Sequence, residues 1–247
     1  MKPGFLIAVA LFVYPGFAPA KENAQGAHHV KADIADVKSL QRGARIFVNY
    51  CMGCHSASFM RYNRLGADLG LSEETLKSNF MFGTDKTGNT MDIAMKGSDA
   101  IRYFGVAPPD LSVIARSRGA DWLYEYFMTF YRDPERPLGV NNLKFMDVAM
   151  PHVLWELQGY LRPVYKTVVN PDGSRSEILD KLEQETPGAL TPEQYGRTIH
   201  DLVNFLVYLA EPAKMQRQKI GTWVILYLLV FLVLAYLLKK EYWKDVS

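Results

Sequence analysis

Two apolar segments, one near each end of the chain, flank a long region in which apolar and polar residues alternate in short groups. The first segment, residues 5–13, follows the basic Lys2 and is closed by the small residues Ala18-Pro19-Ala20. This order is typical of a secretory signal peptide, and the apolar run is too short to span a bilayer. We therefore expect a signal peptide over residues 1–20.

The second segment, residues 220–238, has nineteen residues without a charge. As a helix it would be ~28 Å long, close to the ~30 Å hydrocarbon core of a bilayer. Because none of its faces is polar, a membrane-spanning helix is favoured over a buried core helix. We expect a transmembrane anchor with basic flanks at residues 214–240. Aromatic residues lie towards its ends, as at membrane interfaces: Trp223, Tyr236, Tyr242 and Trp243.

Basic residues lie on both sides of this anchor, so they do not orient it. The signal peptide does, because it predicts that residues 21–213 are exported as a periplasmic domain and that residues 241–247 remain as a short cytoplasmic tail. The chain of 247 residues carries a net charge of +2 and no basic cluster. Nothing in this charge pattern suggests a nucleic-acid partner.

Helical periodicity dominates the region between the two segments. Ser72 is in place to cap one helix, and Thr191, followed by Pro192, is in place to cap the last one. One strand is expected at residues 164–169, followed by a turn at 170–173. The fold class is therefore mainly α with long loops. The expected helices are 40–50, 59–65 as a continuation of the first, 71–80, 111–118, an aromatic helix capped by Asp121, and 191–209.

The only two cysteines of the chain lie in Cys51-Met52-Gly53-Cys54-His55. This CxxCH spacing is the attachment signature of a c-type haem. Two sulfurs on one turn reach the two vinyl groups of the porphyrin edge, and the next residue projects its imidazole towards the iron. A thioredoxin-like pair would follow a strand, whereas residues 40–50 have helical periodicity. A structural zinc site needs four ligands, and no second cysteine pair supplies them.

The residues alone leave the sixth iron ligand open. Met150 is the best candidate because Pro151 biases it to an extended loop conformation, from which a thioether can reach the iron. Met146, His152 and His200 are its rivals, and a methionine is most often a core residue. The adjacent His28 and His29 could form a metal site, but we favour the interpretation that they lie on a solvated N-terminal arm.

In motif order the chain resembles the cytochrome c1 family, the haem subunits of quinol:cytochrome c oxidoreductases (cytochrome bc1 complexes). The resemblance covers nearly the whole chain after the signal peptide, and the ordered set is more specific than CxxCH alone. Two departures are the absence of the extra cysteine pair of some relatives and the residues Tyr103 and Phe104. The matching motifs are Leu40-Gln41-Arg42-Gly43, Cys51 to His55, Phe59, Tyr62, Leu65, Pro108-Pro109-Asp110-Leu111-Ser112, Arg116, Arg118, Met150-Pro151-His152, Ala210-Glu211-Pro212 and the C-terminal anchor.

The resemblance implies a cytochrome c-like haem domain with long loop insertions and one C-terminal transmembrane helix. It implies one covalent haem c on Cys51 and Cys54, with His55 and Met150 as iron ligands. Arg118 would contact a haem propionate, and Pro109 and Trp122 would line the pocket. In the family the first helix, at Gly43 and Phe47, crosses the last one, here near Phe205 and Tyr208.

The implied function is a one-electron relay from a Rieske iron–sulfur protein to a soluble cytochrome c, in a complex that also contains cytochrome b. The chain would be an electron-transfer subunit in the bacterial inner membrane, and not an enzyme alone. The alternatives are a cytochrome c subunit of a terminal oxidase or nitric oxide reductase, a haem enzyme with an open sixth position, and a purely structural anchor, against which the CxxCH motif argues.

The acidic stretch at residues 172–185 offers one candidate docking surface for a basic cytochrome c, by charge steering. An ordinary solvated loop and helix face explains the same stretch equally well. The sequence does not decide between these two interpretations.

Overall fold

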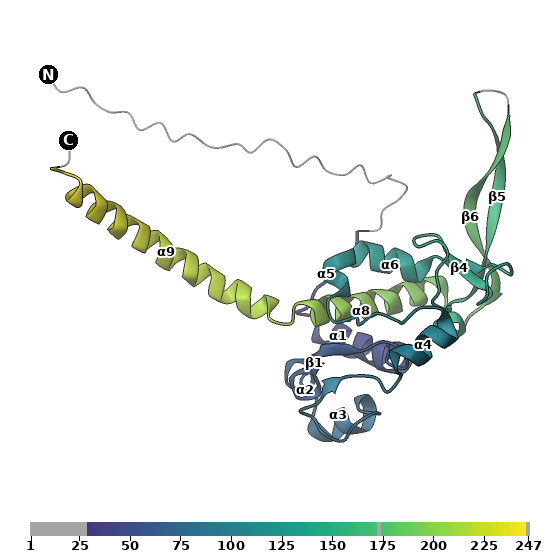
Figure 1. Ribbon diagram of the computed structural model, residues 1–247, viewed down its shortest axis with the longest axis horizontal. Coiled ribbons are helices and arrows are strands. Elements are labelled where there is room, and N and C mark those ends of the chain that lie inside the picture. The colour runs from purple at the N-terminus through teal and green to yellow at the C-terminus, as the bar shows by residue number, and fades with distance from the viewer. Residues whose placement is uncertain (1–28, 172–173, 246–247) are drawn as a thin grey trace.

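The computed structural model describes residues 29–171 and 174–245. A helical body carries a long β-hairpin on one side and a long C-terminal helix on the other (Figure 1). About half of the chain is helical, which confirms the mainly α class. The expected signal peptide lies outside the described residues.

Two helices distant in sequence form the centre of the body. Helix α1 (Val37–Ile46) begins where Asp36 accepts a hydrogen bond from Ser39 N, and helix α8 (Pro192–Ala210) begins at Thr191 with a reciprocal capping box. They cross at Gly43, where an added Cβ would lie 2.1 Å from Asp201 O and 2.7 Å from Phe205 Cβ. The crossing expected at Gly43 and Phe205 is confirmed.

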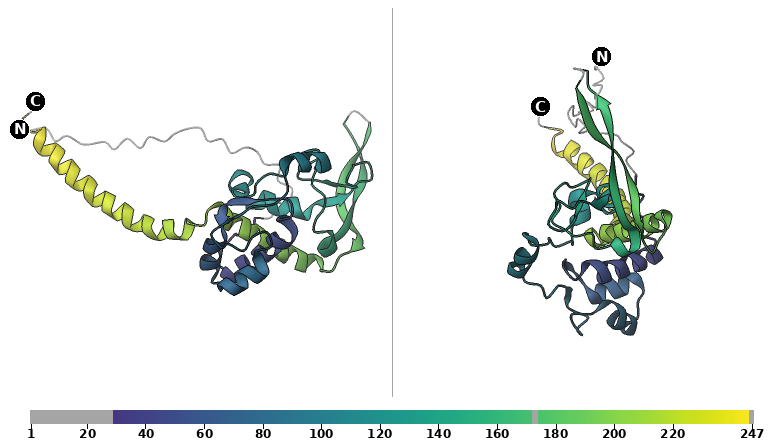
Figure 2. Two further views of the ribbon diagram at one scale, coloured as in Figure 1. Left: turned by 60° about the horizontal axis from the view of Figure 1, so that its bottom comes forward. Right: turned by 90° about the vertical axis from the view of Figure 1, so that its right-hand side faces the viewer.

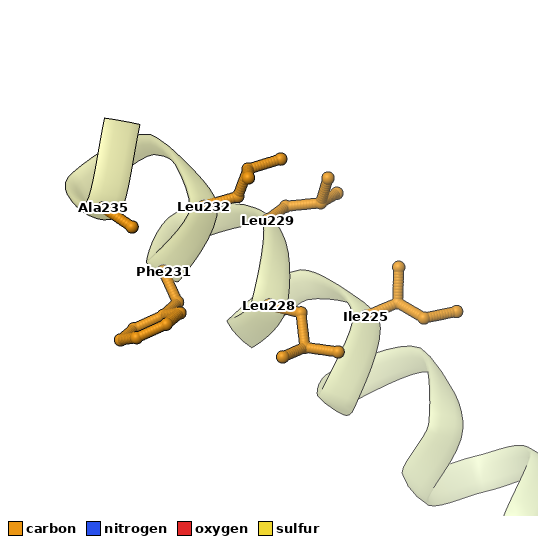
Figure 3. A pocket seen from close by; sticks show the side chains of 6 residues that line it. All are labelled: Ile225, Leu228, Leu229, Phe231, Leu232 and Ala235. Atoms are coloured by element: carbon orange, nitrogen blue, oxygen red, sulfur yellow. The ribbon is translucent and has the colours of Figure 1, made fainter. Parts of the chain in front are cut away.

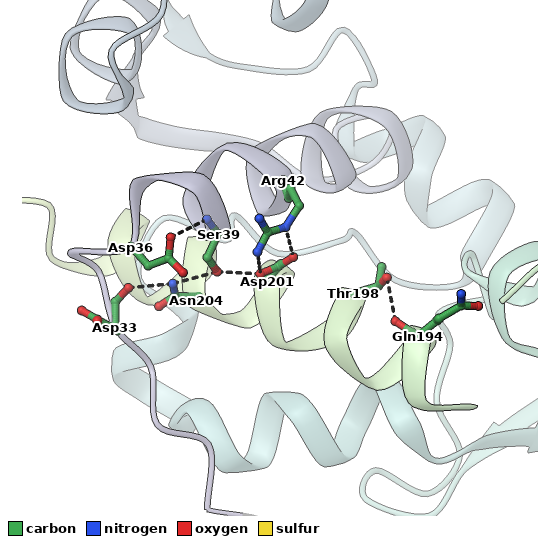
Figure 4. A network of polar contacts seen from close by, with 8 residues as sticks. All are labelled: Asp33, Asp36, Ser39, Arg42, Gln194, Thr198, Asp201 and Asn204. Atoms are coloured by element: carbon green, nitrogen blue, oxygen red, sulfur yellow. Dashed lines mark hydrogen bonds and ion pairs between the residues drawn. The ribbon is translucent and has the colours of Figure 1, made fainter. Parts of the chain in front are cut away.

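Polar side chains surround this crossing (Figure 4). Arg42 forks onto the carboxylate of Asp201 at 2.5 and 2.8 Å, and Ser39 Oγ donates to the same carboxylate at 2.7 Å. The amide of Asn204 donates to Asp33 O at 2.8 Å. Because Asp201 is only 8% exposed, these donors are needed to stabilise its charge away from water.

After α1 the chain continues as a π-helical turn, η1 (Phe47–Cys51). The expectation that residues 59–65 continue this helix is wrong: residues 59–61 are strand, and residues 62–65 belong to a separate helix. Strand β1 (Ala57–Arg61) comes next in the chain and is followed directly by helix α2 (Tyr62–Leu69). Strand β1 pairs with β2 (Thr90–Met91). Hydrogen bonds from Ser58 and Phe59 to distant side chains hold β1 extended.

The remaining helices of the body are short. Ser72 caps its helix as expected. Asp121 does not cap the aromatic helix: Gly119, at φ +88°, is the N-cap, and the Asp121 carboxylate instead accepts from Val30 N at 2.6 Å. These helices are α3 (Glu73–Phe80), α4 (Gly97–Phe104), α5 (Ile114–Arg118), α6 (Ala120–Met128) and α7 (Trp155–Gln158).

Strands β3 (Phe130–Arg132) and β4 (Val140–Asn142) form a small antiparallel pair. The projecting hairpin consists of β5 (Gly159–Val169) and β6 (Arg175–Pro187), and Figure 2 shows it extending beyond the body. The expected strand at 164–169 is therefore confirmed within a longer one. In the acidic stretch 172–185, residues 175–185 belong to strand β6, so the interpretation as a helix face is wrong there.

Helix α9 (Lys214–Tyr242) has 29 residues and fits a transmembrane anchor, since none of its apolar window is buried against the body. Its side chains point away from the helix axis, as the six apolar residues in Figure 3 show, and none of its residues is buried against the described part of the chain. A helix of this length and composition suits the hydrocarbon core of a bilayer.

The α1–α8 crossing generates a first prediction. Gly43→Ala should lower the free energy of unfolding by about 1–3 kcal/mol, because the new methyl group must push the two helices apart. Thermal unfolding of the detergent-solubilised protein measures this. Gly83→Ala is the matched control, because nothing lies within 4 Å of a Cβ added there, and equal losses in the two variants would contradict the close packing.

Candidate haem-binding site

The CxxCH motif forms one tight turn at the end of η1. The backbone N–H groups of Cys54 and His55 both donate to Cys51 O, at 3.0 and 2.9 Å. Cys51 is buried and Cys54 half-buried, and the two sulfurs are not joined as a disulfide. Burial raises the pKa of Cys51 to about 12, so its thiol is protonated. Because no disulfide joins them, both sulfurs remain available for thioether formation.

The imidazole of His55 is oriented by a backbone carbonyl. Its Nδ1 lies 2.7 Å from Pro109 O. The carbonyl can only accept, so Nδ1 carries the proton and the lone pair of Nε2 remains free to bind a metal. Burial lowers the pKa of His55, against the opposite effects of this hydrogen bond and of Asp110. The ring is therefore held in the neutral form that binds iron.

The turn at residues 108–112 is fastened to the segment after the motif. Asp110 accepts from Ser58 N at 2.9 Å and Ser58 Oγ at 2.8 Å, and Ser112 Oγ accepts from Phe59 N at 3.1 Å. Burial opposes ionisation of Asp110, but hydrogen bonds from Ser112 and Ser58 outweigh it and lower the pKa of the carboxyl. These bonds fix the Pro109 carbonyl that orients His55.

Met150 lies on a separate segment, after β4. Its sulfur is 3.2 Å from the hydroxyl of Tyr126, which donates to it. Next to it His152 is buried, with its ring stacked on Phe130 at 4.9 Å and 6°. Burial lowers the pKa of His152 to about 4, and Nε2 has no partner among the described residues. The expected rival Met146 is 59% exposed.

Arg118 on α5 and Trp122 on α6 lie on the side of the site that contains Met150. The guanidinium carbon of Arg118 lies 4.8 Å from the centroid of Trp122, and that indole stacks on the ring of Tyr126 at 5.1 Å. Among the described residues no carboxylate is within ion-pair distance of Arg118. Its charge is therefore available to an anionic group such as a propionate.

Comparison with known proteins assigns the chain to a family. A model of the Cytochrome C1 family matches residues 27–246. The chain belongs to the cytochrome c1 family. It is 45% identical over 241 residues to cytochrome c1 of Allochromatium vinosum, covering 98% of each chain. A protein of Nitrosomonas europaea named ammonia monooxygenase gamma subunit is 50% identical over 214 residues, covering 87% of this chain and 86% of the relative. Cytochrome c1 of Rhodospirillum rubrum is 28% identical, covering 86% and 83%.

The family is one of membrane haem cytochromes, and the contacts around its CxxCH motif include several that the sequence did not reveal. The sequence indicates an aromatic helix in this region without singling out Tyr126, whose hydroxyl contacts Met150 in the structure. Asp110 and Ser112 belong to a motif that carries the family resemblance, but the sequence assigns them no role. Asp and Ser side chains in a turn commonly accept hydrogen bonds from nearby backbone N–H groups. This residue pattern is the sequence signal that could have indicated their role. Two other histidines considered from the sequence lie elsewhere. Nε2 of His200 is 3.4 Å from Lys31 O, and Nδ1 of His29 is 3.2 Å from a carboxylate oxygen of Asp121.

The fastened turn yields a pH prediction. Asp110→Asn should lower the free energy of unfolding at neutral pH by roughly 1 kcal/mol or less, because the charged acceptor is lost at an exposed site. The lowered pKa means that the wild-type advantage is fully present above the unfolded value of about 3.9 and is lost as the pH falls through the folded value. Thermal melts over a pH series measure it.

Asp85→Asn is the control for this series, because Asp85 is exposed and makes no hydrogen bond or ion pair with the described residues. A wild-type advantage over Asp110→Asn that grows in acid would contradict the role assigned to the carboxylate.

Proposed function

We propose that the protein is the haem subunit of a respiratory quinol:cytochrome c oxidoreductase. In this role it relays single electrons from a Rieske iron–sulfur subunit to a soluble cytochrome c, beside cytochrome b. The observation that carries the proposal is the CxxCH turn with the His55 imidazole oriented by Pro109 O at 2.7 Å. The 45% identity to a cytochrome c1 over 98% of the chain supports the same role.

The residues present fit one covalent haem c. Cys51 and Cys54 would hold it through thioethers, and His55 Nε2 and Met150 Sδ would be the two axial ligands. Arg118 would pair with a propionate, and Pro109 and Trp122 would line the pocket. When bound, the haem supplies a one-electron iron couple, and His–Met ligation gives a relatively high potential. A sixth ligand from the protein also leaves no open position for oxygen.

The same proposal sets the topology. Residues 21–213 would form the periplasmic domain, α9 would cross the bacterial inner membrane, and residues 241–247 would be cytoplasmic. The uncovered apolar surface of α9 supports a single membrane anchor. The signal peptide that orients it is a prediction from residues outside the described part of the chain.

The hairpin does not support the acidic docking surface. Its two strands carry four acids and four bases, and three acids are in ion pairs: Glu183 with Arg162, Asp180 with Lys166, and Glu185 with Arg132. A surface with balanced, paired charges does not steer a basic partner strongly.

Purification tests the assembly. The full-length protein extracted in mild detergent should copurify with a cytochrome b and a Rieske protein, and quinol should reduce its haem. The name of the Nitrosomonas relative gives a second candidate, a subunit of a monooxygenase. Copurification with monooxygenase or terminal oxidase subunits in place of cytochrome b would overturn the proposal.

Met150→Leu tests the sixth ligand. Leucine keeps the volume and apolarity, so the fold should lose ~1.5 kcal/mol or less, while the iron loses its soft neutral ligand. The redox potential should fall, carbon monoxide should bind the reduced haem, and quinol oxidation by the complex should stall. Potentiometry and optical spectra measure these changes.

Met146→Leu is the matched control and should keep the wild-type spectrum and potential. In both variants acid–acetone extraction should leave the haem on the polypeptide, because the cysteines are intact. A wild-type spectrum in Met150→Leu would assign the ligand elsewhere, with Met146, His152 and His200 as the next candidates.

A further inference from the structure

Tyr126 places a phenolic hydroxyl on the sulfur of Met150. The hydroxyl oxygen is 3.2 Å from Sδ, within the range allowed for a bond to sulfur. The side chain is only 8% exposed. A buried phenol needs an acceptor, and within the described part of the chain this hydroxyl donates to the thioether alone. A tyrosine here therefore does more than fill the core, which phenylalanine would do equally well.

The ring of Tyr126 is held in place on several sides. It stacks on Trp122 with the planes 10° apart, and it meets Phe127 and Phe130 edge-on at 5.4 and 5.1 Å. Phe130 in turn stacks on His152, two residues after Met150. The hydroxyl and the segment that carries the sulfur are thus fixed by one aromatic cluster, so their contact costs little further ordering.

The contact has an electronic consequence if the sulfur binds iron. A thioether has two lone pairs, so one can bind the metal while the other accepts from the phenol. A donated hydrogen bond withdraws electron density from sulfur and weakens its donation to the metal. Ferric iron depends on that donation more than ferrous iron does, so the bond favours the reduced state. Hydrogen bonding around a ligand is one of the ways in which a protein sets a haem potential.

We propose that Tyr126 is a positioning residue that orients Met150 Sδ through its hydroxyl and raises the redox potential of the bound haem. The inference rests on the proposed function, since Met150 must be the sixth ligand.

Tyr126→Phe in the full-length, haem-loaded protein isolates the hydroxyl, because the ring and its stacking remain. The long-wavelength absorption band of ferric His–Met haem should persist. At a fixed solution potential the ferric-to-ferrous ratio should rise about two- to tenfold, the equivalent of one neutral hydrogen bond. The midpoint potential should accordingly fall by roughly 20–60 mV, since tenfold corresponds to ~59 mV for one electron.

Tyr195→Phe is the matched control. Tyr195 is also buried, and its hydroxyl donates to Phe127 O on α6 at 3.0 Å. It loses a comparable bond beside the same helix without touching Met150. It should therefore lower the melting temperature and leave the potential at the wild-type value.

The outcomes separate the two proposals. An unchanged potential in Tyr126→Phe, while Met150→Leu loses the long-wavelength band, would overturn the role of Tyr126 and leave the ligand assignment standing. Equal shifts in Tyr126→Phe and Tyr195→Phe would also overturn it, because the cause would then be general loosening of α6. A long-wavelength band that survives in Met150→Leu would instead remove the ligand assignment on which the inference rests.

Discussion

Where α1 crosses α8, the backbone at Gly43 lies so close to Asp201 and Phe205 that no side chain fits between them. This approach fixes α1, and through η1 it fixes the position of Cys51, the first residue of the CxxCH turn. On its other side α8 also holds α6, because Tyr195 donates to Phe127 O. Both η1 and α6, which carry residues of the candidate site, are therefore positioned by the same pair of helices, α1 and α8. A displacement at the crossing would move the cysteines relative to Tyr126 and Met150.

The histidine half of the site is positioned by hydrogen bonds and much less by burial. In the turn at 108–112, Pro109 and Asp110 are exposed and Ser112 is buried, and Asp110 and Ser112 together accept several bonds from residues 58–59 and from the turn itself. A proline has no backbone N–H, so the carbonyl is the one backbone hydrogen-bonding group of Pro109, and it accepts from His55. This gives a rigid acceptor for His55 without enclosing it in a dry core. The arrangement suits an electron carrier, in which one side of the cofactor must stay near the surface.

Structural features that depend on neighbouring residues could be predicted from the sequence, whereas contacts between distant segments could not. The caps at Ser72 and Thr191, the apolar anchor and the CxxCH turn each depend on residues a few positions apart, and they were predicted correctly as elements. The Gly43 crossing came from the family resemblance, not from periodicity. Strand β1 was missed because its bonds go to Asp110 and Ser112, about fifty positions away along the printed chain. Asp121 looked like a cap, but its carboxylate accepts from Val30, which no local pattern reveals.

The same limit applies to Met150, the candidate axial methionine, and its environment. Spacing alone could not separate Met150 from Met146, because both are loop methionines in one short stretch. The structure distinguishes them by surroundings: Met146 is largely exposed, whereas Met150 packs against the core and accepts from Tyr126. The indole of Trp122 lies between Arg118 and Tyr126, in contact with both. One ring therefore positions both the charge available to a propionate and the phenol that contacts the sulfur. Charge and ligand environment are consequently coupled through packing, and neither can be set independently of α6.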